Sequence, residues 1–77
     1  MKERKTVDYL VIIGNYGYGW DYIEAAPYED KEEIKDLLAD LKSYRKNETD
    51  ARFKTVFCRF KKDNDIYHQL RMRNYKG

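Results

Sequence analysis

The spacing of hydrophobic residues predicts a β-hairpin in the N-terminal third of the chain. Residues 7–13 are apolar or β-branched at nearly every position, which favours a central strand covered on both faces, and we expect this strand over residues 7–16. The segment 14–20 places glycines where a turn needs positive φ, so it is expected to form the hairpin tip. A second strand is expected over residues 20–25, and Pro27 is expected to end it, because proline cannot donate a ladder hydrogen bond.

The pattern then changes to helical spacing. Asp30, with Glu33 three residues later, matches an acidic N-cap with glutamate at the third helical position. Acidic residues gather in the early turns and basic residues near the end, which complements the helix dipole. The apolar residues at helical spacing are Ile34, Leu37, Leu38, Leu41 and Tyr44. We therefore predict an amphipathic helix that begins after Asp30 and stops near Asn47.

Alternating apolar and polar residues predict a second hairpin. Its first strand spans residues 52–62, with Val56, Cys58 and Phe60 on one face, and residues 62–65 have turn chemistry. In its second strand Ile66, His68, Leu70 and Met72 alternate with Tyr67, Gln69, Arg71 and Arg73. The predicted fold is therefore α+β in the order ββαββ, a four-stranded antiparallel sheet with one amphipathic helix packed on one face.

Length and composition fit one small domain. The 77 residues are expected to form a single domain over residues 1–77, with frayed ends at 1–6 and 74–77. Cys58 is the lone cysteine, which excludes an intramolecular disulfide and favours a reducing, cytoplasmic location. The longest apolar run, residues 9–13, is far shorter than the roughly 20 residues of a membrane span and too short for a signal peptide. We expect a soluble, unprocessed protein that does not bind membranes.

Aromatic residues are numerous for so short a chain: eight tyrosines, three phenylalanines and one tryptophan. Such rings stabilise a thin core, but a core under one helix cannot bury all of them, so several tyrosines are expected at the surface. The hairpin supplies the candidate protein- or ligand-binding residues, which are Tyr16, Tyr18, Trp20 and Tyr22. Trp20 and the glycines are interpreted as mainly architectural, which leaves Tyr16 and Tyr18 for recognition.

Charge is divided unevenly along the chain. Residues 21–50 hold ten acids and five bases, whereas residues 51–77 hold eight bases and two acids. The acidic helix face is interpreted as solvated surface; if it is functional, it would imitate nucleic-acid phosphate or meet a basic protein. In the basic third, strand parity puts Tyr67 and Tyr75 on the same side as four bases that form a candidate nucleic-acid surface: Arg59, Lys61, Arg71 and Arg73. The alternative is a solvated sheet face whose charges protect an edge strand.

Catalytic groups are scarce. The chain has one serine, Ser43, one cysteine, Cys58, and one histidine, His68. Cys58 and His68 could meet across the second hairpin, but both are predicted to lie on apolar faces, where a cysteine packs as a small hydrophobe. No Cys or His pair has metal-ligand spacing, and no Walker-type phosphate loop is present. We therefore predict no enzyme activity, no catalytic residues, no metal and no cofactor.

Three stretches of the chain carry a resemblance to a group of known proteins. They are the hairpin over residues 14–21 with the pattern G-N-Y-G-x-G-W, the helix end over residues 41–48 with the pattern L-x-x-Y-R-x-N-E, and the strand start over residues 52–56. In these stretches the chain resembles short, generally uncharacterised proteins encoded by bacteriophages. Those proteins tend to end soon after the third strand, so the resemblance does not support a strand within residues 63–77.

The resemblance implies a function through binding. Small phage proteins often inhibit a host or defence enzyme, so it implies a non-catalytic accessory protein in the bacterial cytoplasm that binds and inhibits a host or defence factor. An anti-CRISPR or related anti-defence role follows by the same analogy. Two alternatives stay open, a nucleic-acid-binding module that uses the basic C-terminal hairpin and a nucleotide pocket at the Gly/Tyr/Trp hairpin. The open sheet edge also allows a homodimer.

Overall fold

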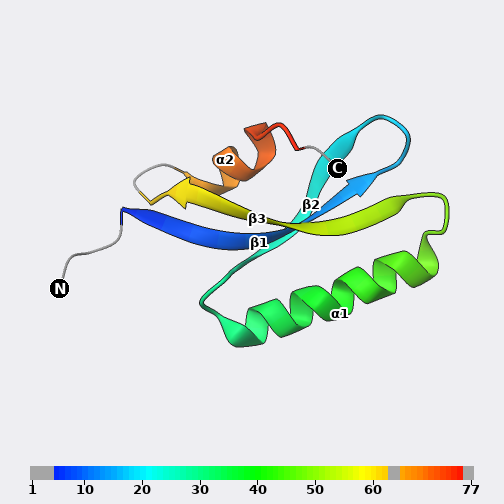
Figure 1. Ribbon diagram of the computed structural model, residues 1–77, viewed down its shortest axis with the longest axis horizontal. Coiled ribbons are helices and arrows are strands. Elements are labelled where there is room, and N and C mark those ends of the chain that lie inside the picture. The colour runs from blue at the N-terminus through cyan, green and yellow to red at the C-terminus, as the bar shows by residue number, and fades with distance from the viewer. Residues whose placement is uncertain (1–4, 63–64, 76–77) are drawn as a thin grey trace.

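The structure, a computed structural model, describes residues 5–62 and 65–75. Its elements are β1 (Thr6–Asn15), β2 (Trp20–Pro27), α1 (Lys31–Asn47), β3 (Arg52–Lys61) and α2 (Ile66–Met72). The strands form an antiparallel sheet in the order β2-β1-β3, with α1 on one face and α2 on the other (Figure 1). The predicted α+β class is confirmed, whereas the sheet has three strands and not four within the described part of the chain.

The central strand β1 is buried on both faces, as its continuous apolar pattern predicts. Val11 and Ile13 pack on the α2 side of the sheet, and Ile12 between them packs on the α1 side. All three side chains are completely buried. The molecule therefore has two small cores that share β1, where one core under a single helix was expected.

The hairpin between β1 and β2 has the predicted glycine turn. Gly17 and Gly19 have φ of 103° and 102°, a conformation that residues with a Cβ rarely adopt. The side chain of Asn15 stabilises the turn, because its Oδ1 accepts a hydrogen bond from the Gly17 N–H at 2.8 Å. Residues of the turn itself therefore determine its conformation.

A β-bulge interrupts the pairing of β2 with β1, a feature that the hydrophobic pattern does not predict. Ile12 pairs with Glu24 and Ile13 pairs with Tyr22, so Ile23 is an extra residue in β2. Ile23 packs in the α1-side core, and the adjacent Glu24 lines a depression beside α1. The bulge therefore turns two consecutive side chains towards the same helix.

Helix α1 begins and ends as predicted. The Asp30 side chain accepts a hydrogen bond from the Glu33 N–H at 3.1 Å, which is the expected N-cap. Leu37 and Leu41 are buried against the sheet. The helix ends at Asn47, in agreement with the predicted stop.

The prediction of a fourth strand over residues 66–72 is wrong, because this segment is the short helix α2. Its N-cap is Asp65, whose carboxylate accepts a hydrogen bond from the Tyr67 N–H at 3.0 Å. Leu70 is buried against the sheet, while His68 and Met72, which a strand would have placed on the same side, are exposed. Residues 63 and 64, in the middle of the predicted turn, lie outside the described residues.

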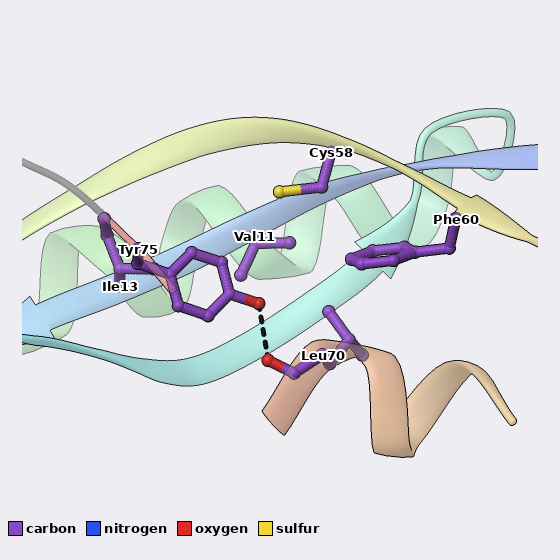
Figure 2. Packing of buried hydrophobic residues seen from close by; sticks show 6 residues of the cluster. All are labelled: Val11, Ile13, Cys58, Phe60, Leu70 and Tyr75. Atoms are coloured by element: carbon purple, nitrogen blue, oxygen red, sulfur yellow. Dashed lines mark hydrogen bonds between the residues drawn. The ribbon is translucent and has the colours of Figure 1, made fainter. Parts of the chain in front are cut away.

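The segment after α2 completes the core on the α2 side. Tyr75 is buried beside Val11, Ile13 and Cys58, and its hydroxyl donates a hydrogen bond to the Leu70 carbonyl at 2.7 Å (Figure 2). Burial raises the pKa of Tyr75 to about 12, so the phenol remains a donor at neutral pH. The expected fraying therefore does not include Tyr75, nor Thr6, which begins β1; residues 1–4 and 76–77 lie outside the described residues.

Candidate binding surfaces

One end of the molecule brings the hairpin tip next to the loop that joins α1 to β3 (Figure 1). The Tyr16 hydroxyl donates a hydrogen bond to Glu48 Oε2 at 3.3 Å, and its ring meets Phe53 edge-on with centroids 5.7 Å apart. A shallow depression of about 360 Å³ lies between Tyr16 and residues 47–51. A second, of about 250 Å³, is lined by Asn15, Gly17, Asp50 and Arg52. We call this end the hairpin-tip surface and define it by Tyr16, Tyr18, Glu48, Asp50 and Arg52.

The four predicted binding residues of the hairpin do not form one patch. Tyr18 is 95% exposed at the apex and Tyr16 is 47% exposed. Trp20 and Tyr22 instead pack against the core on the α2 side, on the opposite face from the Phe53 ring that Tyr16 contacts. Tyr16 and Tyr18 are thus the residues that the structure leaves accessible, whereas Trp20 and Tyr22 support the fold.

Trp20 and Tyr22 each make a further contact on the α2 side. The Lys54 ammonium lies 5.2 Å from the centre of the Trp20 ring, a favourable cation–π contact. Tyr22 meets Tyr67 of α2 edge-on at 6.4 Å. These contacts tie β2 to β3 and to α2, so they have a structural role.

The four basic candidates are divided between the two faces of the sheet. Arg59 donates a hydrogen bond to Asp8 Oδ1 at 2.8 Å, and strand alternation places Lys61 on the same α1 side. Arg71 and Arg73 belong to the α2 side, where their guanidinium groups lie 5.7 Å from the Tyr67 ring and 5.9 Å from the Phe60 ring. The single basic face expected from strand parity required a fourth strand. Because this segment is a helix, the four bases form two separate pairs on opposite faces of the sheet.

An acidic depression of about 370 Å³ lies between β2 and α1. Its acidic lining residues are Glu24, Glu33, Asp36 and Asp40. Burial raises the pKa of Glu24 to about 6, and the neighbouring Asp40 adds to this effect. One carboxylate oxygen of Glu24 is buried without a hydrogen-bond partner among the residues that the structure describes. Sequence reasoning missed Glu24 because nothing in the hydrophobic pattern indicates the bulge that turns it inward.

The nucleophile and base candidates occupy different environments. Cys58 is buried in the core on the α2 side of the sheet, where burial raises the pKa of its thiol, and His68 is exposed on α2. Within residues 5–62 and 65–75, no three His, Cys, Asp or Glu side chains are grouped to hold a metal ion. None of the helices in this part of the chain is long and apolar enough to cross a membrane.

Comparison with known proteins adds no relative: no protein family, no curated protein and no solved structure matches this chain. The resemblance to short phage proteins stays a prediction.

Proposed function

We propose that this chain is a small non-catalytic binding protein of the phage type, which binds and inhibits a bacterial host or defence factor through the hairpin-tip surface. One observation carries the proposal: Tyr18 is 95% exposed at the apex of a turn that two positive-φ glycines define. Tyrosine contributes a large contact area and has only two side-chain torsions to fix, so an exposed tyrosine on an ordered turn suits protein recognition.

The surroundings of Tyr18 support recognition of a protein. Tyr16 is oriented by Glu48 and Phe53, so its accessible edge has a defined position next to the apex. Partial burial, together with the charge of Glu48, raises the pKa of Tyr16, and the phenol therefore stays protonated as a donor. Asp50 and Arg52 supply charges beside the turn, which is the polar rim that protein interfaces need.

The resemblance to phage proteins points to the same end of the molecule. Its three stretches are distant in sequence but meet around Phe53: Tyr44 stacks on the Phe53 ring at 5.4 Å, and Arg45 donates two hydrogen bonds to the Phe53 carbonyl at 3.2 and 2.9 Å. Tyr16 completes this cluster. If these stretches are shared because they build one structure, that structure is the support of the hairpin tip. An anti-CRISPR or related anti-defence role extends the proposal by analogy.

The test is capture of a protein from nuclease-treated bacterial lysate by the wild-type chain and by Tyr18→Ala. We expect a stoichiometric protein partner whose recovery falls at least tenfold with Tyr18→Ala, because an exposed aromatic anchor is removed while the core is untouched. Tyr67→Ala is the matched control, since Tyr67 is also a largely exposed tyrosine (58%) but lies on α2. Equal recovery with Tyr18→Ala, or no stoichiometric protein at all, contradicts the proposal.

The two alternatives have weaker support from the geometry. A nucleic-acid surface would have to use either the Arg59 and Lys61 pair or the Arg71 and Arg73 pair, because the two pairs lie on opposite sides of the sheet. A nucleotide pocket between the hairpin rings would need Tyr16 and Trp20 on one face, and they pack on different faces. Oligonucleotide affinity that weakens steeply with salt would favour the first alternative over the proposal.

A further inference from the structure

Strand β3 is an edge of the sheet, and its backbone groups point alternately towards β1 and away from it. Hydrogen bonds from two side chains show which β3 residues turn their backbone N–H and carbonyl groups away from β1. Gln69 bonds to both the N–H and the carbonyl of Lys61, at 3.2 and 2.9 Å, and Arg45 bonds to the carbonyl of Phe53. By the same alternation the backbone groups of Thr55, Phe57 and Arg59 also point outward. The bond from the Lys62 N–H to the Lys5 carbonyl at 3.0 Å fits this parity, since it points to the β1 side.

The outer edge of β3 is thus closed at both ends and open in the middle. Arg45 occupies the Phe53 end and Gln69 occupies the Lys61 end. Between them, the outward backbone groups of residues 55–59 have no hydrogen-bond partner among the residues that the structure describes. An open row of alternating donors and acceptors on a regular strand is the surface to which an extended segment can add as a further strand.

The side chains beside this open edge form two contact sites, one on each face. On the α1 side, Phe57 (52% exposed) and Tyr28 (54% exposed) meet edge-on at 5.2 Å. On the α2 side a depression of about 280 Å³ is lined by residues 56–58 and 73–75. A strand added here would place alternate side chains against the exposed rings and into the depression, because successive side chains of a strand point to opposite faces.

Charge favours an acidic occupant over a second copy of this strand. Residues 51–62 contain five bases and no acid, and Arg73 contributes another base to the depression. Antiparallel pairing of two copies centred on Phe57 would bring the basic ends of both β3 strands together, with Arg52 of one copy near Lys62 of the other, and like charges close together oppose such pairing. Arg59 is already paired with Asp8, so an acidic strand would be attracted by the bases at the two ends of β3 and by Arg73 in the depression.

We propose that the open edge of β3 binds an extended acidic segment of a partner protein as a fourth strand of the sheet. Acidic side chains of the segment face Arg73, and apolar side chains cover Phe57 and Tyr28. This surface shares no residue with the hairpin-tip surface, so the inference is independent of the proposed function and either can fail alone.

The first test uses a capped nine-residue peptide that alternates glutamate with valine, titrated into the full chain and followed by NMR. We expect saturable shifts centred on residues 55–59 and slower hydrogen exchange at the amides of Thr55, Phe57 and Arg59. The amides of Val56 and Cys58 should change little, because they already pair with β1. Unchanged exchange at the three outward amides overturns the proposal.

Peptide controls separate strand addition from simple attraction of charges. In one control peptide the backbone amides of all valines are N-methylated, and in a second those of all glutamates. The amides of valine and of glutamate point to opposite edges of the added strand, so only one of the two peptides is blocked on the edge that faces β3. We expect that peptide to lose affinity at least tenfold, and the other methylated peptide to bind within about twofold of the unmethylated peptide. Equal affinities, or equal binding of a lysine–valine peptide, overturn the proposal. Protection of the same amides that rises with protein concentration alone also overturns it, because the occupant would then be a second copy.

A protein variant tests the charge. Arg73→Glu should weaken binding of the glutamate–valine peptide at least fivefold, because it reverses the charge in the depression. Arg71→Glu is the matched control with the same change of net charge, and it should alter the affinity less than twofold, since Arg71 does not line the depression. Equal effects of the two variants contradict a site at the β3 edge.

Discussion

The two edge strands of the sheet, β2 and β3, differ in how accessible their unpaired backbone groups are to another strand. Strand β2 is irregular: the bulge at Ile23 breaks its alternation, and Pro27 ends it with a residue that has no N–H to offer. Strand β3 is regular over ten residues, and side chains cover only its two ends. Bulges and prolines are common protections against unwanted pairing, so β2 is a blocked edge and β3 an accessible one.

Charge reinforces this difference between the edges. The depression beside β2 is lined by four acids and by no base, whereas β3 itself carries bases and Arg73, directly after α2, adds another. The unequal charge along the sequence therefore becomes a difference between two sides of a folded domain. Any partner that distinguishes the two sides would do so by charge as well as by access to the backbone.

The largest expected effect on stability comes from weakening the packing of α2 against the sheet. Leu70→Ala should destabilise the protein by about 3 kcal/mol, because it leaves a cavity among Val11, Phe60 and Tyr75. Chemical denaturation measures the loss, and hydrogen exchange should show faster opening at Lys61 than at β2 amides that pair with β1. Met72→Ala is the control on the exposed side of the same helix, with an expected change within about 0.5 kcal/mol. Equal losses for the two variants would contradict the packing of α2.

How far the sequence predicts the fold differs between these regions. β1, the glycine turn, α1 and β3 follow from strong local signals, such as the Asp30 cap and the continuous apolar run in β1. Helix α2 does not, because Ile66 and Leu70 share a face in a helix as well as in a strand, and seven residues do not separate the two periods. The contacts of Gln69 with Lys61 and of Leu70 with the core favour the helix over a strand, and both are tertiary contacts.

The candidate surfaces show the same limit. Exposure of Tyr16 and Tyr18 and packing of Trp20 are confirmed, because turn chemistry and residue size determine them locally. The neighbours of the hairpin tip are not local: the Glu48 contact joins residues 32 positions apart. The open window of β3 is also hidden in the sequence, since it depends on where Arg45 and Gln69 reach the edge.

A smaller effect is expected when one end of the β3 edge is opened. Gln69→Ala removes the side chain that bonds to both backbone groups of Lys61, so we expect a loss of about 1.5 kcal/mol and faster exchange of the Lys61 amide. His68→Ala, at the exposed neighbouring position, controls for changes in helix propensity. Unchanged exchange at Lys61 would show that Gln69 does not close the edge, and the open window would then be longer than residues 55–59.

The smallest effect concerns the blocked edge, where the bulge holds Glu24 against α1. The pKa of Glu24 is raised from 4.5 to about 6, so the folded state keeps this proton more tightly than the unfolded chain, and wild-type stability falls as the pH rises between these values. Glu24→Gln removes the buried charge and should stabilise the protein at pH 7.5 by about 1 kcal/mol, less than the full shift implies because the site is partly solvated. Below about pH 4.5 this advantage should vanish, since both states then carry a protonated Glu24.

Urea unfolding at pH 4 and pH 7.5 measures the difference, and Glu33→Gln, an exposed acid of the same depression, controls for the loss of one negative charge. A stabilisation that is the same at both pH values, or equal in the two variants, would mean that the bulge does not bury the Glu24 charge and that the two edges differ in backbone geometry alone.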